Sequence, residues 1–167
     1  MADKTSFTPD EWTQILQSPM VAGIAITAAE PSGLWGVLQE SLAGGSALAK
    51  AAMDPAANAL VKAVTVDFKT PEARSAARDG LQAKLKGSKP ADMKAKSIDA
   101  LRQVSALLDA KAPADASAFK DWLRQISQST AEAASEGGIL GFGGVKVSDA
   151  EKATLAEIST ALGLART

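Results

Sequence analysis

The sequence of 167 residues contains no cysteine, no histidine and no tyrosine. The absence of cysteine excludes disulfides, thiolate nucleophiles and cysteine-based zinc sites. The absence of histidine excludes an imidazole base, an imidazole haem ligand and a histidine switch near neutral pH. The commonest acid–base and nucleophilic side chains of enzymes are therefore missing, and the sequence favours a function without catalysis.

Aromatic residues make up only 4% of the chain, although hydrophobic residues make up 46%. Alanine supplies much of this apolar content, and alanine is the best helix former. No window alternates between polar and apolar residues for long enough to indicate a strand. We therefore predict an all-α, single-domain bundle of about seven helices over residues 1–167, with residues 1–6 as a disordered tail.

Long apolar runs and an excess of one charge are also absent. The longest apolar run, Met20–Ala29, is too short to span a bilayer, and the first residues lack the pattern of a signal peptide. The net charge of −1 gives no general attraction to nucleic acid or anionic membranes. We expect a soluble, cytoplasmic protein without a transmembrane segment.

Prolines and capping residues divide the chain into helices. Thr8-Pro-Asp-Glu11, Thr70-Pro-Glu72 and Ser148-Asp-Ala-Glu151 are typical helix starts, and Gly163 is a typical helix end. Ser18-Pro19 is expected to end the first helix and to start the next. Apolar spacings predict further helices over about 34–53, 60–68, 71–85 and 90–111, and another that carries Phe119, Trp122, Leu123 and Ile126.

The segment Met20–Ala29 consists almost entirely of small or apolar residues, which is typical of a buried helix. We interpret it as the central helix of the bundle. Ala22, Gly23, Ala25 and Ala29 would let neighbouring helices approach closely, and a self-association face is the alternative. Interior packing is the favoured interpretation.

The segment 136–147, Glu-Gly-Gly-Ile-Leu-Gly-Phe-Gly-Gly-Val-Lys-Val, holds five glycines and five apolar side chains between two predicted helices. It matches neither the phosphate-loop nor the dinucleotide-binding pattern. Three interpretations stay open: a packed structural loop, a backbone nest that binds an anion with Lys146, and an exposed contact surface. In the third, Ile139, Leu140 and Phe142 are exposed and meet a partner or a membrane surface. Trp35 is a further candidate contact for a partner or ligand.

Basic residues are concentrated between Lys62 and Arg102, where ten basic residues stand against five acidic ones. Within this stretch a cluster of lysines surrounds one predicted turn and forms a candidate basic patch: Lys84, Lys86, Lys89, Lys94 and Lys96. The patch suits an acidic partner, nucleic acid or the acidic N-terminal half. However, acidic residues are interleaved and no aromatic residue is available to stack on a base, so a solvated face is favoured over nucleic-acid binding.

Two stretches resemble a group of small, functionally uncharacterised bacterial proteins. They are Pro19–Gly33, Pro-Met-Val-Ala-Gly-Ile-Ala-Ile-Thr-Ala-Ala-Glu-Pro-Ser-Gly, and the glycine-rich segment 136–144 with the following Val147–Glu151. The resemblance implies an all-helical bacterial cytosolic protein, but it implies no activity, cofactor or site residue.

Two function hypotheses follow from the sequence. The first is a non-catalytic protein–protein interaction or scaffolding protein, with an unknown protein or a second copy of itself (a homodimer) as partner. The second is a protein that binds a small apolar or anionic ligand between helices, with segment 136–147 as a lid. The carboxylates are dispersed and lack metal-ligand spacing, so the sequence predicts no catalytic, metal or cofactor-binding residue.

Overall fold

The computed structural model describes residues 2–29, 50, 53–54, 56–136 and 147–164. These residues are helical throughout, apart from turns and short connections, and none lies in a strand. The prediction of an all-α fold is therefore confirmed for the described part of the chain. The helix predicted over about 34–53 and the glycine-rich residues 137–146 lie outside it.

One short 3-10 helix and six α-helices are described. The helices predicted over about 60–68, 71–85 and 90–111 agree within one residue with those in the structure. The elements are η1 (Lys4–Ser6), α1 (Pro9–Ala29), α4 (Ala59–Asp67), α5 (Pro71–Leu85), α6 (Pro90–Lys111), α7 (Pro113–Glu136) and α8 (Asp149–Ala161).

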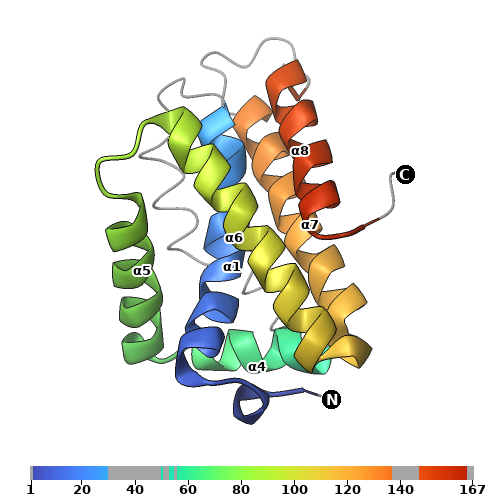
Figure 1. Ribbon diagram of the computed structural model, residues 1–167. Helices are drawn as coiled ribbons and strands as arrows, with labels where there is room; N and C mark the ends of the chain where they lie inside the picture. The colour runs from blue at the N-terminus through green and yellow to red at the C-terminus, as the bar shows by residue number, and fades with distance from the viewer. Residues whose placement is uncertain (1, 30–49, 51–52, 55, 137–146, 165–167) are drawn as a thin grey trace.

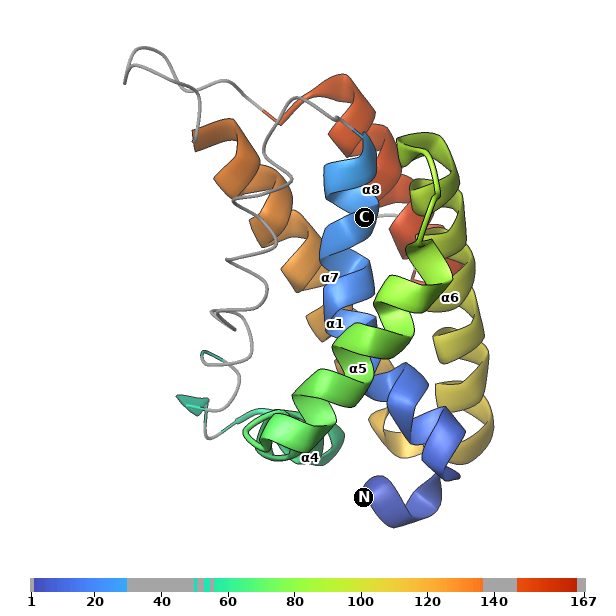
Figure 2. The same ribbon diagram turned by 90° about the vertical axis from the view of Figure 1, so that its left-hand side faces the viewer.

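Four helices run alongside one another and two lie across or outside them. Figure 1 shows α1, α6, α7 and α8 side by side, with α4 crossing beneath them at the end that also carries the N-terminus. Figure 2 shows α5 crossing α1 on the outer side of this bundle. Helix α1 contacts α5, α6, α7 and α8, and it is therefore the central helix.

The small residues of α1 are used inside the fold. Ala22 and Ala25 have no exposed surface, and Gly23 is buried. Their small size brings α7 close to the backbone of α1, because the Ser127 hydroxyl donates a hydrogen bond to the Ala22 carbonyl at 3.1 Å. Interior packing, the favoured interpretation of this segment, is confirmed.

The predicted break at Ser18-Pro19 is wrong, because α1 continues through Pro19 as one helix of 21 residues. Proline has no N–H, so it leaves the carbonyl four residues earlier, that of Ile15, without its helical donor. The Ser18 hydroxyl donates a hydrogen bond to this Ile15 carbonyl at 2.7 Å, and both residues are buried. The serine thus replaces the missing donor, which allows the proline to stand inside the helix.

Predicted helix ends are confirmed in detail. The Thr8 N–H donates to a Glu11 carboxylate oxygen at 2.7 Å, and the Glu11 N–H donates to the Thr8 hydroxyl at 3.3 Å. Ser148 and Glu151 form the same reciprocal capping box at the start of α8. Gly163 has a φ of +69°, the left-handed conformation that ends helices and that glycine adopts at little cost.

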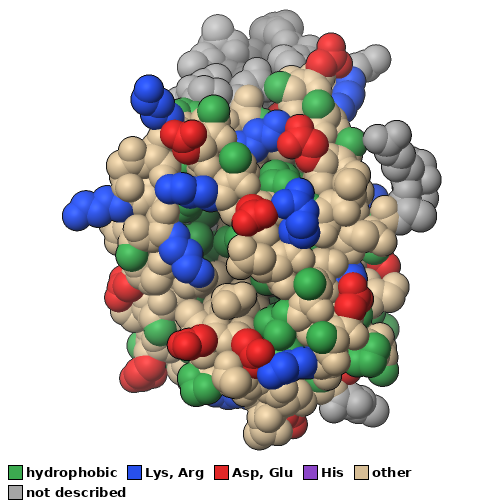
Figure 3. All heavy atoms as spheres, in the orientation of Figure 1, with side chains coloured by type: hydrophobic (Ala, Val, Ile, Leu, Met, Phe, Trp, Pro, Cys, Tyr) green, Lys and Arg blue, Asp and Glu red, His purple; other side chains and the backbone are tan. Residues whose placement is uncertain are grey.

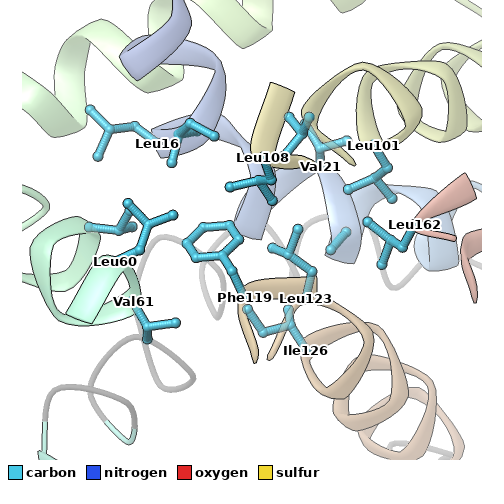
Figure 4. Close-up of a cluster of buried hydrophobic side chains, with 14 of the residues drawn as sticks. Leu16, Val21, Leu60, Val61, Leu101, Leu108, Phe119, Leu123, Ile126 and Leu162 are labelled. Carbon is cyan, nitrogen blue, oxygen red and sulfur yellow. The ribbon is translucent and has the colours of Figure 1, made fainter. Parts of the chain in front are cut away.

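The hydrophobic core lies where α1, α4, α6 and α7 meet. Phe119 of α7 is fully buried and stands at its centre, with leucine and valine side chains from α1, α4 and α6 around it (Figure 4). Leu162, directly after α8, closes the far side of the cluster. Removal of these large apolar side chains from water makes the dominant favourable contribution to the free energy of folding.

Helices α6, α7 and α8 are also joined by a polar junction. Lys120 of α7 has a side chain only 8% exposed, and its ammonium group contacts both carboxylate oxygens of Asp109 at 2.7 Å. Asp109 itself is 61% exposed. Nearby, the Ser105 hydroxyl donates to the Leu162 carbonyl at 3.0 Å, so this end of α8 is fixed to α6.

The N-terminal residues pack against the base of the bundle. Within the segment 1–6 predicted as a tail, η1 is formed by residues 4–6 and Ala2 is buried. The Asp67 carboxylate, at the end of α4, accepts hydrogen bonds from the Trp12 indole N–H at 2.7 Å and from the Lys4 ammonium at 3.0 Å. Burial raises the pKa of Asp67, but these two donors outweigh it and hold that pKa below its ordinary value.

Candidate functional site

An open groove lies between α4 and α7, with a volume of about 450 Å³. Its apolar lining comes from both helices and from the turn before α4. Val61 and Ile126 are buried at its base, whereas Trp122 is half-buried. The apolar residues that line it are Ala56, Ala57, Val61, Ala118, Trp122 and Ile126.

Hydrogen bonds fix the two walls of the groove relative to one another. Asn58 caps α4, because its side-chain oxygen accepts from the Leu60 N–H at 2.8 Å. The Asn58 amide nitrogen donates to the Asp115 carboxylate, in the first turn of α7, at 2.7 Å. The other oxygen of this buried carboxylate accepts from the Ala2 N–H at 2.7 Å. The starts of α4 and α7 are therefore tied together, and the groove is preformed.

Trp122 is held in place from inside the protein. Its ring packs edge-to-face on Phe119, with ring centroids 5.2 Å apart and planes inclined at 70°. Phe119 is fully buried, so the tryptophan rests on the centre of the core while part of its own surface stays accessible. The groove thus presents an aromatic surface whose position is fixed by the core beneath it.

The rim of the groove is polar and carries both signs of charge. Asp54 and Lys50 are exposed on one side, and Asp121 is partly exposed on α7. Gln125 and Ser129 continue the rim along α7 with groups that donate and accept hydrogen bonds. The lining therefore combines apolar surface with charged groups and groups that donate or accept hydrogen bonds.

Metal-binding chemistry has no counterpart in the described structure. Across residues 2–29, 56–136 and 147–164 no three acidic side chains gather as a metal ion would need. In the same part of the chain, no helix combines the length and apolar character required to cross a bilayer.

The candidate contact residues from the sequence fall outside the described part of the chain. These residues are Trp35, Ile139, Leu140, Phe142 and Lys146. Of the predicted glycine-rich loop, only its two ends are described: Glu136 is the last residue of α7, and Val147 is half-buried against the core. The three interpretations of this loop therefore stay predictions.

The structure brings the five lysines of the candidate basic patch to the α5–α6 connection, but it gives three of them internal partners. Lys94 pairs with Glu157 of α8 at 2.8 Å. Lys96 donates to the Lys84 carbonyl at 3.3 Å and to the Ser88 hydroxyl at 2.7 Å. Lys84 donates to the Gln17 side-chain oxygen at 3.1 Å.

Lys86 and Lys89 of this patch are exposed. Figure 3 shows several basic side chains with an acidic one among them over the α5–α6 connection, and basic and acidic side chains mixed over the rest of this face. The role of the candidate basic patch stays a prediction.

Reasoning from sequence missed the groove. The apolar spacing of Phe119, Trp122, Leu123 and Ile126 predicts a helix, but it does not show that Trp122 is only half-buried. One available signal was that Trp122 and Leu123 are adjacent, which widens the stripe beyond one buried face. The link from Asn58 to Asp115 spans 57 residues and has no local pattern by which it might be recognised.

Comparison with known proteins identifies no relative. No protein-family model, no curated protein and no solved structure matches this chain. A fold by itself does not define a function, which depends on the site that the fold carries. The function is therefore argued from the α4–α7 groove alone.

Proposed function

We propose that this protein is a non-catalytic binding protein that receives a segment of a partner protein in the α4–α7 groove. The observation that carries the proposal is the half-buried Trp122, set in a preformed apolar groove with a polar rim. Tryptophan surrounded by polar residues is the commonest type of residue that dominates binding energy at protein interfaces.

The rim indicates the chemistry of the partner segment. The described rim contains two carboxylates, those of Asp54 and Asp121, and one ammonium group, that of Lys50. It therefore carries an excess of negative charge. A segment with an apolar side chain to cover Trp122 and a nearby lysine or arginine complements this arrangement. The apolar contact supplies most of the affinity, and the charges supply orientation and association rate.

Site-specific photocrosslinking tests the location. A photoreactive residue in place of Gln125, on the rim, is expected to capture a discrete protein in cells. The same residue in place of Gln103, exposed on α6, serves as the matched control and is expected not to capture it. Capture of the same protein at both positions, or at neither, would contradict the proposed site.

Binding measurements with the purified partner test the chemistry. We expect Trp122→Ala to weaken binding by more than about tenfold. Asp121→Lys is expected to reduce the association rate, with a smaller effect at high salt. Asp99→Lys on α6 makes the same change of charge at an exposed pair that contributes little to stability, and it should leave binding unchanged. Equal effects of the two lysine variants would argue against a groove-specific role.

A small ligand is the second candidate function, because the groove volume lies within the range of ligand pockets, about 300–1,000 Å³. Native mass spectrometry of the protein purified from its own host distinguishes the two. A small bound mass that is lost in Trp122→Ala would favour the ligand. A bare protein mass, together with a captured protein at Gln125, would favour the partner segment.

The glycine-rich segment 136–147 supplies a further contact surface in this proposal, on the sequence argument alone. Phe142→Ser tests it. If Phe142 contacts a partner or a second copy, the change alters assembly and leaves the melting temperature nearly constant. A large fall in melting temperature with unchanged assembly would instead identify Phe142 as part of a packed structural loop.

A further inference from the structure

Helix α5 buries a smaller share of its residues than any other described α-helix. Of its fifteen residues only Ala77 and Leu81 are buried, whereas α4, with nine residues, buries four. Its principal neighbour is α1, which it crosses on the outer side of the bundle (Figure 2). A helix with so few buried side chains belongs to the low-stability part of a structure.

A single polar side chain of α1 joins the two helices. Gln17 is buried, its amide nitrogen donates to the Ala77 carbonyl at 3.3 Å, and its side-chain oxygen accepts from the Lys84 ammonium at 3.1 Å. Both partners belong to α5. We call this contact the Gln17 latch, defined by Gln17, Ala77 and Lys84.

The latch requires a glycine in the middle of α5. A Cβ atom at Gly80 would lie 2.6 Å from the Gln17 amide nitrogen, which is closer than real Cβ atoms come to such an atom. Glycine is less favourable than alanine in the interior of a helix. The residue that makes room for the latch therefore also lowers the intrinsic stability of the helix that the latch holds.

Contacts other than those to Gln17 hold the two ends of α5. At its start, the Thr70 hydroxyl accepts from the Ala73 N–H at 3.3 Å and donates to the Asp67 carbonyl at 2.8 Å. At its other end, Lys96 of α6 donates to the backbone carbonyl of Lys84 in the last turn of α5 and to the Ser88 hydroxyl beyond it. Gly87 stands in this connection with a φ of +72°.

We propose that α5 opens away from α1 as one cooperative unit between these two fixed ends, while α1, α6 and α7 stay folded. Opening transfers Gln17 from its α5 partners to water, where both of its polar atoms find hydrogen bonds. It also uncovers the face of α1 that surrounds Gln17. The Gln17 latch thus makes α5 a reversible cover over the central helix.

The absence of cysteine allows a direct test with single thiol probes in the full chain. Ala77→Cys places the probe on the buried face of α5, and Ala22→Cys places the control on α1. Both alanines have no exposed surface. Under native conditions we expect a thiol reagent to label the α5 probe more than about tenfold faster than the control. Labelling at Ala77 should also respond more weakly to low urea, because less surface is exposed in the opening.

Equal labelling rates with equal urea dependence at the two positions would overturn the proposal, because both probes would then report global unfolding. Hydrogen exchange on the unmodified chain gives a second measurement that needs no cysteine. Amides of residues 74–85 are expected to exchange through an opening of lower free energy than those of the middle of α6. A common opening free energy for the two helices would equally overturn it.

Two substitutions identify the latch as the cause. Gln17→Ala is expected to accelerate exchange in α5 about fivefold or more, with much smaller changes in α6 and α7. In this background Gly80→Ala finds space for its Cβ atom and should slow exchange in α5 again by about fivefold. Unchanged α5 exchange in Gln17→Ala would contradict the role of the latch.

Discussion

Helices α1 and α5 contain similar kinds of residue but occupy opposite positions in the fold. Both are rich in alanine, both begin with a threonine cap followed by proline, and both contain an internal glycine. Yet α1 buries thirteen residues and α5 buries two. Alanine and caps make a helix in either place, and the number of large apolar side chains decides whether other helices pack around it.

The two helices also treat polar groups differently. In α1 the hydroxyl groups of Ser18 and Thr27 are buried and bond to carbonyls of the same helix. In α5 the polar side chains are mostly exposed, and the buried polar contact is supplied by Gln17 from outside. The buried hydroxyl groups of α1 are thus satisfied within the helix, whereas the buried polar contact of α5 depends on a neighbour. Two predictions test this contrast, and two more concern other contacts of the fold.

The largest difference is expected from one substitution made in both helices. Leu16 of α1 is 4% exposed and Leu81 of α5 is 8% exposed. Leu16→Ala should lower the free energy of unfolding by about 3–4 kcal/mol, and Leu81→Ala by about 2 kcal/mol or less, because the site on α5 collapses more easily. Urea denaturation measures both, and equal losses would remove the contrast.

Ser18→Ala tests the hydrogen bond by which α1 satisfies the Ile15 carbonyl within the helix. It leaves the buried Ile15 carbonyl without a donor, and we expect a loss of about 1–3 kcal/mol. Pro19→Ala restores the backbone N–H at that place, so the double variant should be more stable than Ser18→Ala alone. A double-mutant cycle by urea denaturation measures this coupling, and strictly additive effects would contradict the role assigned to Ser18.

The junction of α6 and α7 should respond unequally to loss of its two partners. Asp109→Ala leaves the buried Lys120 ammonium without a carboxylate and should cost about 1–2 kcal/mol. Lys120→Met leaves only an exposed carboxylate, which water solvates, and should cost less than about 1 kcal/mol. Thermal or urea unfolding would contradict this prediction if the order of the two losses were reversed.

The smallest effect concerns pH at the base of α1. The pKa values of Asp67 and Glu11 lie below their ordinary values, Asp67 because its two donors outweigh burial and Glu11 because Lys111 donates to it at 2.6 Å. Groups with a lowered pKa stabilise the folded state above the unfolded pKa, and this contribution is lost as pH falls. Unfolding free energy should therefore fall below about pH 4. Asp67→Asn should lose part of this dependence, and an unchanged pH profile would contradict it.

Local patterns predicted most of the described helices, because caps and apolar spacing act over a few residues. Thr8, Thr70 and Ser148 were recognised as caps in this way, and Gly163 as a helix end. The predicted break at Pro19 was wrong because the Ser18 hydroxyl replaces the donor that proline lacks, and the rotamer of Ser18 that allows this cannot be read from the sequence. The groove was missed because it depends on where α4 lies relative to α7, which long-range contacts such as Asn58 to Asp115 determine.

The hydrogen bond from Ser18 to the Ile15 carbonyl has a consequence for how this chain can change over generations. Replacement of Pro19 by an ordinary helix former is expected to give the Ile15 carbonyl a second donor. Replacement of Ser18 is expected to cost more while Pro19 is present than after Pro19 has been replaced. We therefore expect the order in which the two positions change to affect the stability of the intermediate sequence.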